Sequence, residues 1–306
     1  MRPTNPISHF KSGFVAVVGR PNVGKSTLIN TFIGQKISAV SSKPQTTRFK
    51  QLGILTDEDA QIVFVDTPGI HEPKHALGKG MNAIAQEALI DADIVLWLVD
   101  ISRKPHAEDR IIAERLKGLP SVIQALNKID LVTEDDELTQ KQYLYKKLLP
   151  SVEQIVISAL EGSGFDNLYK WLLSYLSEGP PYYPEEQITD INEREIAADL
   201  IREAALNKLH DEIPHSIAVR IDEYKERGVT GAFIAATIFV ERDSQKGIVI
   251  GGQGGMLKKI GTAARKAIEA MSSRTIFLDL RVKIKKNWRT DSAFLKKIGY
   301  SNLGED

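Results

Sequence analysis

The stretch "FVAVVGRPNVGKSTLI" (Phe14–Ile29) joins an apolar run to a helical pattern through a loop that fits G-x-x-x-x-G-K-[ST]. Gly19 and Gly24 let the backbone curl so that its N–H groups can point at phosphate oxygens. Lys25 brings a positive charge to the outer phosphates, and Ser26 offers a hydroxyl to Mg²⁺. The stretch therefore predicts a strand, a phosphate-binding loop and a helix. The predicted contacts here are Gly19, Asn22, Val23, Gly24, Lys25, Ser26 and Thr27.

The base is indicated by "NKID" (Asn127–Asp130), which follows another apolar run. The Asp130 carboxylate only accepts hydrogen bonds, which suits the two adjacent donors on the edge of guanine and no such pair on adenine. A backbone N–H in "SA" (Ser158, Ala159) can donate to the guanine carbonyl. We therefore expect GTP rather than ATP, with Asn127, Lys128 and Asp130 in the base pocket.

The metal and the γ-phosphate are indicated by "VFVDTPG" (Val63–Gly69) and "KPQTTR" (Lys43–Arg48). Asp66 is placed to hold Mg²⁺ through water, and the Gly69 N–H to contact the γ-phosphate. The hydroxyl of Thr47, which we favour over Thr46, would bind Mg²⁺ when the third phosphate is present. The predicted metal set is Ser26, Thr47 and Asp66.

Apolar runs alternate with helical patterns from Gly13 to about Ser177, which predicts an α/β fold with a mostly parallel sheet and helices on both faces. A proline-rich stretch, "EGPPYYPEEQ" (Glu178–Gln187), reads as a linker. A helical pattern, two alternating strands, a helix and a long strand follow, which predicts a second, α+β domain. The expected division is a P-loop GTPase domain at 1–178, a linker at 179–190 and a second domain at 191–306.

A cluster of glycines, "VIGGQGG" (Val249–Gly255), lies in the second half. A second phosphate loop is a poor interpretation because no Lys-Ser or Lys-Thr follows, which leaves a structural hairpin or the G-x-x-G loop of a KH domain. We interpret the preceding "IVI" as the end of a strand and the following residues, about Met256 to Met271, as an amphipathic helix. In a KH domain such a turn clamps about four nucleotides of single-stranded nucleic acid. The predicted RNA contacts are Gly251, Gly252, Gln253, Gly254, Lys258 and Lys259.

The formal charge is zero over 306 residues, yet Met256 to Lys297 carries twelve Lys or Arg against three Asp or Glu, a surplus of 12 − 3 = +9. This segment is either a solvated basic face or a site for a polyanion. The chain has no cysteine, its N-terminus lacks the apolar core of a signal peptide, and no apolar run approaches the roughly 18 residues of a membrane span. We therefore expect a cytoplasmic protein of two domains.

The five nucleotide motifs, in this order, resemble those of the translation-factor-related GTPases, with Asn22 in the phosphate loop, "QTTR" and "DTPG" as hallmarks. Ile70 follows "DTPG", where Ras-like enzymes carry a glutamine that orients water, so the resemblance implies slow unaided hydrolysis. Relatives with asparagine at the Asn22 position resemble potassium-activated GTPases, which makes K⁺ a candidate cofactor beside GTP and Mg²⁺. The implied catalytic residues are Asn22, Lys25, Thr47 and Gly69.

With its second half included, nearly the whole chain resembles the Era family of bacterial ribosome-assembly GTPases, whose second domain is a type II KH domain. The resemblance implies a GTP-driven switch that binds the 3′ end of 16S ribosomal RNA, with the GTP-bound form binding and hydrolysis linked to release. It also implies a monomer, with peripheral contact with the inner membrane as a secondary trait. The turn reads Gly-Gly-Gln-Gly (Gly251–Gly254) and lacks the basic residue that the family usually has within it, a departure that bears on RNA affinity more than on the fold.

Two alternatives of other classes stay open at this point. One is a membrane-associated regulatory GTPase whose basic tail binds anionic lipids. The other is a nucleotide-regulated scaffold that turns over too slowly to count as an enzyme.

Overall fold

The structure is a computed structural model that describes residues 9–41, 43, 46–70, 76–210, 213–228 and 230–298. It separates into two compact units. The first comprises Met1–Gly34, Phe49–Glu72 and Ile84–Asp190, and the second Gln35–Arg48, Pro73–Ala83 and Ile191–Asp306. The predicted boundaries at 178 and 191 stay a prediction.

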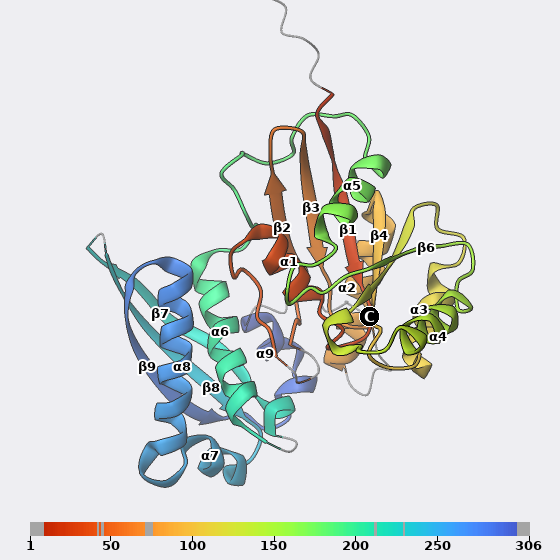
Figure 1. The fold of residues 1–306 in the computed structure, drawn as a ribbon. Coiled ribbons are helices and arrows are strands. Elements are labelled where there is room, and N and C mark those ends of the chain that lie inside the picture. The colour runs from red at the N-terminus through yellow and green to blue at the C-terminus, as the bar shows by residue number, and fades with distance from the viewer. Residues whose placement is uncertain are drawn as a thin grey trace, which may run out of the picture. The chain divides into compact units, whose positions relative to one another are not determined.

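The first unit is built on a six-stranded sheet in the order β2-β3-β1-β4-β5-β6 (Figure 1). All neighbouring pairs are parallel except β2 with β3. The strands are β1 (Lys11–Val18), β2 (Gln51–Thr56), β3 (Ala60–Asp66), β4 (Ile94–Asp100), β5 (Val122–Asn127) and β6 (Glu153–Val156). The predicted mostly parallel sheet is thus confirmed.

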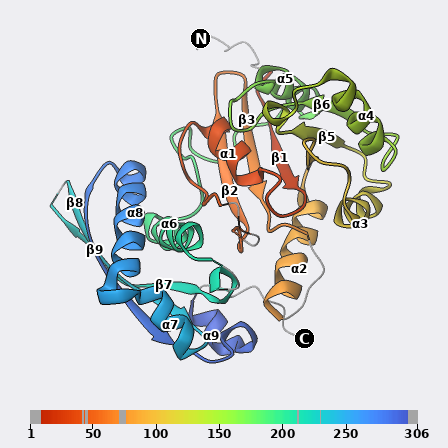
Figure 2. The ribbon, with the colours of Figure 1, turned by 60° about the horizontal axis from the view of Figure 1, so that its bottom comes forward.

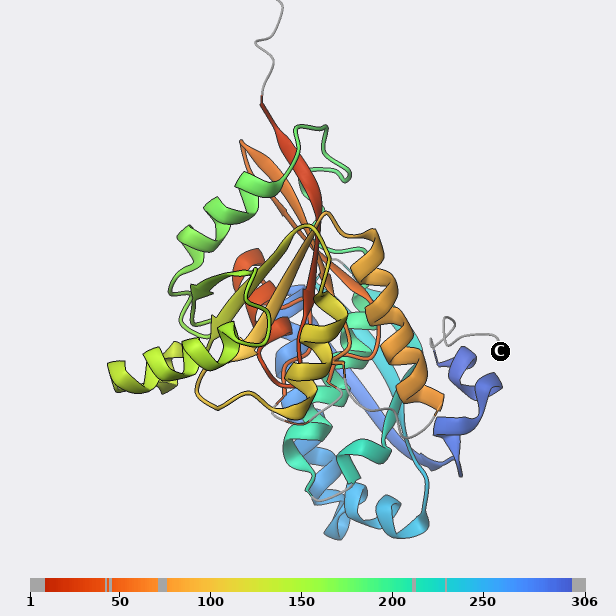
Figure 3. The same ribbon diagram turned by 90° about the vertical axis from the view of Figure 1, so that its right-hand side faces the viewer.

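Helices cover both faces of this sheet (Figure 3). They are α1 (Lys25–Ile33), α2 (Ala76–Asp91), α3 (Ala107–Leu116), α4 (Asp135–Lys146) and α5 (Phe165–Tyr175). The part of α2 before Ile84 groups with the second unit. The core on one face contains residues of α2 and α3 together with Tyr145 of α4. On the other face the ring of Phe32 in α1 stacks on those of Phe64 in β3 and Phe165 in α5, at centroid distances of 5.0 and 4.4 Å.

The linker stretch packs against the first unit instead of standing free of it. The backbone N–H of Ile54 donates to the carbonyl of Ile188 at 2.9 Å. The side chain of Gln61 donates to the Tyr183 carbonyl at 2.8 Å and accepts from the Tyr182 N–H at 2.7 Å. Its path is therefore set by β2 and β3, the former being a strand that sequence reasoning did not predict.

The second unit has a three-stranded sheet in the order β7-β8-β9, with β7 antiparallel and β9 parallel to β8. Helices α6 and α8 lie over one face of this sheet (Figure 2) and contribute most of the helical residues of its core. The elements are α6 (Glu193–Lys208), β7 (Ala218–Arg227), β8 (Gly231–Val240), α7 (Asp243–Ile250), α8 (Gly255–Ser272), β9 (Thr275–Ile284) and α9 (Ser292–Lys297). Short 3₁₀ turns span Ile129–Leu131, Ile213–Ser216, Gly252–Gly254 and Trp288–Thr290.

One local prediction is wrong: "IVI" is not the end of a strand but the last turn of α7. The Gln245 side-chain oxygen accepts the backbone N–H groups of Glu241 at 2.9 Å and Arg242 at 3.1 Å, which closes the N-terminal end of that helix. Within the turn, Val249 is buried while Ile248 is half exposed. A run of three apolar residues is too short to show the hydrophobic periodicity of either a strand or a helix, so the sequence could not distinguish the two.

Candidate functional site

The phosphate loop lies between the end of β1 and the start of α1, so the backbone N–H groups that open α1 face the loop. Its conformation depends on residues in the left-handed region, with φ of 64° at Asn22 and 106° at Gly24. A Cβ on Gly24 would lie 2.4 Å from the side-chain nitrogen of Asn127, and one on Gly19 would lie 2.3 Å from the Leu98 carbonyl oxygen. Both glycines of the motif are therefore required by close approach.

Lys25 is the charged group of this loop and is only 6% exposed. Its Nζ donates to the carbonyl oxygens of Gly19 at 3.2 Å and Arg20 at 3.1 Å. Burial lowers the pKa of Lys25 to about 8, while the Asp66 carboxylate acts in the opposite direction. The ammonium is thus held inside the curl of the loop.

Ser26 and Asp66 meet at the end of β3, where Ser26 Oγ donates to Asp66 Oδ2 at 2.7 Å. A hydroxyl and a carboxylate oxygen side by side fit the hard oxygen ligands that Mg²⁺ takes when phosphates and water complete its shell. Among the described residues there is no group of three or more His, Asp or Glu that could hold a metal by itself. The pair therefore fits a magnesium ion that is shared with a nucleotide.

The "DTPG" stretch packs closely on the phosphate loop. A Cβ on Gly69 would lie 2.6 Å from the backbone nitrogen of Pro21, and the Ile70 N–H donates to the Gly19 carbonyl at 3.3 Å. The Ile70 side chain is 2% exposed and belongs to the core. It therefore offers no polar group for orienting water.

Asn127 connects the phosphate loop to the "SA" loop. Its Nδ2 donates to the Val23 carbonyl at 2.7 Å, and its Oδ1 accepts the Ala159 N–H at 2.8 Å. Asp130 Oδ1 accepts from Ser158 Oγ at 2.5 Å. The structure thus brings the predicted base-recognition residues together at one end of the sheet.

Asp100, at the end of β4, is a residue that sequence reasoning missed. Lys128, whose φ is 70°, donates from Nζ to Asp100 Oδ2 at 2.8 Å. Although burial alone would raise it, hydrogen bonds from Lys128 and Ser102 hold the pKa of Asp100 below its usual value. An acid closing the apolar run "IVLWLVD" (Ile94–Asp100) was the signal that could have identified it.

Arg20 and Asp109 form a second missed pair, an ion pair of 2.8 Å with Asp109 wholly buried. It anchors the phosphate loop to the first turn of α3, where Asp109 also accepts the His106 N–H at 2.8 Å. Burial alone would lower the pKa of Arg20. The charge of the Asp109 carboxylate and its hydrogen bond to Arg20 outweigh that effect, so the pKa is raised. The two residues are 89 positions apart, so no local pattern links them.

Thr47 lies in the segment Gln35–Arg48, which groups with the second unit. The next residue, Arg48, is 1% exposed, donates to the Ile217 carbonyl at 3.1 Å and lies 5.4 Å from the ring centroid of Trp288. The backbone beside Thr47 is therefore anchored within the second unit. Its role as a magnesium ligand stays a prediction.

The glycine cluster turns from α7 into α8 with positive φ at Gly251 (70°), Gln253 (51°) and Gly254 (77°). A Cβ on Gly251 would lie 2.7 Å from Met256 Cβ, whereas one on Gly252 would meet nothing within 4 Å. The tip of the turn is thus open to a close approach by another chain.

A groove of about 390 Å³ runs from this turn between α8 and β9. Lys258 lies in it with Arg265, while the exposed Lys259 is not part of its lining. Leucines of both α8 and β9 line the groove. Apolar side chains can contact bases, and the neighbouring cations can contact phosphates. Its lining residues are Gly254, Leu257, Lys258, Gly261, Thr262, Arg265, Leu278 and Leu280.

Comparisons with known proteins match both halves of the chain. A family described as 50S ribosome-binding GTPase matches residues 14–128, and a KH domain family matches residues 212–289. GTPase Era of Ruminiclostridium cellulolyticum is 47% identical over 292 residues, which cover 95% of this chain and 98% of that protein. This chain belongs to the Era family of GTPases. It is therefore a GTPase with a C-terminal KH domain.

Solved structures of Era superpose on nearly the whole chain. One, in complex with MgGDPNP and nucleotides 1506–1542 of 16S ribosomal RNA, is 40% identical with a TM-score of 0.91 and covers 95% of this chain and 99% of its own. Another, a variant of Aquifex aeolicus Era bound to GDP and AlF₄⁻, is 40% identical with a TM-score of 0.89 and the same coverage.

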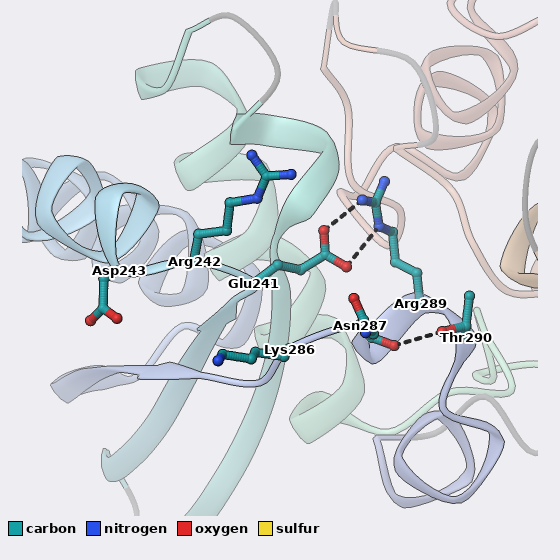
Figure 4. Close-up of a pocket in the computed structure, with 7 residues that line it drawn as sticks. All are labelled: Glu241, Arg242, Asp243, Lys286, Asn287, Arg289 and Thr290. Carbon is teal, nitrogen blue, oxygen red and sulfur yellow. Dashed lines mark hydrogen bonds and ion pairs between the residues drawn. The ribbon is translucent and has the colours of Figure 1, made fainter.

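This Era-family chain has a further hollow, of about 580 Å³, at the ends of β8 and β9 (Figure 4). Arg289 crosses it and pairs with Glu241 through Nε at 3.2 Å and Nη2 at 2.5 Å. In Figure 4 the side chain of Lys286 points away from that pair. Sequence reasoning predicted a basic segment here but no pocket, because Glu241 and Arg289 are 48 residues apart.

Among the described residues, none of the helices is both long and apolar enough to span a bilayer.

Proposed function

We propose that this chain is a GTP-hydrolysing molecular switch that binds the 3′ end of 16S ribosomal RNA and acts in small-subunit assembly. The observation that carries the proposal is the occurrence in one chain of the Ser26–Asp66 pair at a phosphate loop and an apolar, basic groove at a G-x-x-G turn. The Era structure solved with MgGDPNP and 16S RNA, 40% identical to this chain, supports it.

For the nucleotide we propose that the Asp130 carboxylate accepts hydrogen bonds from guanine and that Lys25 contacts the outer phosphates. We propose that Asn127 holds the phosphate loop and the "SA" loop in place through its bonds to Val23 and Ala159. Ser26, Asp66 and Thr47 would hold Mg²⁺, which supplies charge neutralisation on the phosphates. The Gly69 N–H is assigned to the γ-phosphate. The proposed nucleotide-binding residues are Gly19, Asn22, Val23, Gly24, Lys25, Ser26, Thr27, Asp66, Gly69, Asn127, Lys128, Asp130, Ser158 and Ala159.

We further propose that potassium accelerates hydrolysis, with Asn22 as its protein ligand. The support is the left-handed backbone of Asn22 within the phosphate loop together with the buried, apolar side chain of Ile70. Single-turnover hydrolysis should be faster in potassium than in sodium chloride, and Asn22→Ala should remove the difference. Equal rates of the parent in the two salts would refute this part of the proposal.

For RNA we propose that the G-x-x-G turn clamps the backbone, Lys258 and Arg265 neutralise phosphates, and the leucines of the groove contact bases. The turn residues assigned to RNA are Gly251, Gly252, Gln253 and Gly254, with Lys258 and Lys259 in the helix that follows.

The decisive experiment is a titration of the protein with labelled single-stranded RNA from the 16S 3′ end, with GDPNP or GDP bound. Tighter binding in the GDPNP form is expected, with an affinity that falls as salt rises, because phosphate contacts release counterions. Equal affinity for an unrelated RNA of the same length would contradict the assigned target.

We propose that the protein works as a monomer in the cytoplasm and contacts the inner membrane peripherally. The surplus of basic residues between Met256 and Lys297 supports attraction to anionic lipid as well as to RNA. Analytical ultracentrifugation tests the monomer. Flotation with vesicles, with and without competing RNA, separates the two polyanions.

A further inference from the structure

The sheet of the KH domain has an outer face, opposite α6 and α8, that is covered only in part. Alternation along β8 and β9 turns Ile234 and Ile276 into the core and Phe233 and Phe277 outward. At one end of this face Phe239 is buried, 6% exposed, against the ring of Phe294 in α9. At the other end Phe277 is 63% exposed.

Phe277 and Phe233 are directly opposite each other in the parallel pair, and their rings stack at a centroid distance of 5.7 Å. The guanidinium of Arg227 lies 4.9 Å from the Phe233 centroid. Lys225 is opposite Phe233 on the other side, in β7. These four residues, Lys225, Arg227, Phe233 and Phe277, form what we call the outer platform: two aromatic rings edged by two cations.

The charge of the outer face favours a polyanion. Five cations stand against three carboxylates, a surplus of 5 − 3 = +2, and each carboxylate pairs with a neighbouring cation of its own strand. An exposed aromatic surface marks an interaction site, and a positive surround selects a negative partner. The cations are Arg220, Lys225, Arg227, Arg281 and Lys283, and the carboxylates are Asp222, Glu223 and Asp279.

The outer platform adjoins the RNA groove through a single strand. β9 is the edge strand of its sheet, and its Leu278 and Leu280 line the groove. Because side chains alternate along a strand, Phe277 projects from the same edge to the opposite face. A strand of RNA that leaves the groove across β9 therefore meets the ring of Phe277 next.

We propose that the outer platform is a second RNA-binding surface, on which unpaired nucleotides that flank the groove-bound segment stack against Phe277. Bases stack on exposed aromatic rings with little regard to sequence, while flanking arginine and lysine attract the phosphates. The inference rests on the proposed function, since it assumes that the groove holds single-stranded RNA.

The test compares two RNAs from the 16S 3′ end by fluorescence anisotropy: one of about four nucleotides, the length that a KH groove clamps, and one of about twelve that extends beyond it. Phe277→Ala should weaken binding of the long RNA by about 5- to 150-fold, the range for loss of one stacked base. It should leave the short RNA at parental affinity. Phe277→Trp, which keeps a ring, should retain the long-RNA affinity.

Tyr143→Ala is the matched control, because Tyr143 is an aromatic residue of the first unit that is 59% exposed. It should bind both RNAs like the parent. Ultraviolet crosslinking of the parent to the long RNA should place the adduct on Phe277 itself, as read by fragmentation of the tryptic peptide Thr275–Arg281, which also contains the groove residues Leu278 and Leu280.

Unchanged long-RNA affinity of Phe277→Ala would overturn the proposal, as would equal losses for the long and the short RNA. Retained RNA affinity with weaker binding to small ribosomal subunits would make the outer platform a protein interface, which also overturns it. Failure of the proposed function is recognised separately, because the parent would then bind neither RNA.

Discussion

At the residue scale, the chemistry that we propose for the nucleotide site depends on Lys25, a lysine that is buried away from water. Lys25 is held by two carbonyl oxygens and has a pKa lowered to about 8 by burial. A phosphate favours the charged form, so binding of GTP and protonation of this lysine are linked.

The linkage makes nucleotide affinity depend on pH. Well below pH 8 Lys25 is protonated and affinity should be constant; as pH rises through 8 the free protein loses that charge. At one pH unit above this pKa, binding should be weaker by up to about tenfold, because about one molecule in eleven is still protonated. Equilibrium titration with a fluorescent GTP analogue at constant ionic strength measures this. Lys25→Arg, which stays charged, should abolish the slope, and a slope that persists there would point to another group.

Asp130→Asn should change the preference from guanosine to xanthosine nucleotides. An amide offers a donor where the carboxylate only accepts, which matches the additional carbonyl of xanthine. The variant keeps a side-chain oxygen able to accept from Ser158 Oγ, so the local hydrogen bond survives. Competition binding of GTP against XTP checks the change. GTP binding at the parental level without any gain for XTP would remove Asp130 from the base pocket.

At the scale of elements, the G-x-x-G turn separates residues that shape the backbone from residues that are free to vary. Gly251 is required by its approach to Met256 and its positive φ, whereas Gly252 has open space around its Cα. Gln253 has a φ of 51°, which aspartate and asparagine tolerate better than most residues.

Replacing Gly252 and Gln253 together by aspartate should lower RNA affinity at least tenfold while GTP binding stays unchanged. Each new charge repels a passing phosphate by about 1 kcal/mol or more at close range. The matched control is Gly252→Ala with Gln253→Asn, which changes the same positions without adding charge. Parental RNA affinity in the double-aspartate variant would mean that the cluster is only a turn.

At the scale of the whole molecule, the segment that contains Thr47 belongs to the second compact unit. Glu203 of α6 accepts from Lys36 Nζ at 2.7 Å and from the Val40 N–H at 3.0 Å. A segment expected to respond to the third phosphate is thus held by a helix of the KH fold.

Lys25→Ala should separate the two activities of the molecule. Loss of a charge-assisted phosphate contact costs roughly 2–3 kcal/mol, so GTP affinity should fall about 30- to 150-fold and turnover should become weak or undetectable. RNA affinity should equal that of the parent without nucleotide, because the groove residues are untouched. Filter binding and phosphate release on one preparation check both. Hydrolysis at the parental rate would contradict the assignment of the phosphate loop.

Much of the fold was predictable because its signals are local. Buried parallel strands are continuous apolar runs, as in β1, β3 and β4, and each is followed by a turn and a helical period. Strand β2 escaped prediction because its pairing with β3 is antiparallel and its sequence, "QLGILT", carries no alternation. The last turn of α7, "IVI", was mistaken for a strand because Gln245, whose side chain closes the first turn of the helix, precedes this apolar run and is not part of it.

The sequence by itself determined the phosphate loop, the base motif and the G-x-x-G turn, because each is a contiguous run whose residue types the chemistry demands. Only the tertiary structure decided which distant groups complete them. Asn127 bridges Val23 and Ala159, and Leu278 forms a groove with α8 while its neighbour Phe277 faces the other way. The physical reason is that successive side chains of a strand point to opposite faces of its sheet, and the alternation alone does not say which face is buried. Only the packing of helices on one face leaves the other face exposed for a partner.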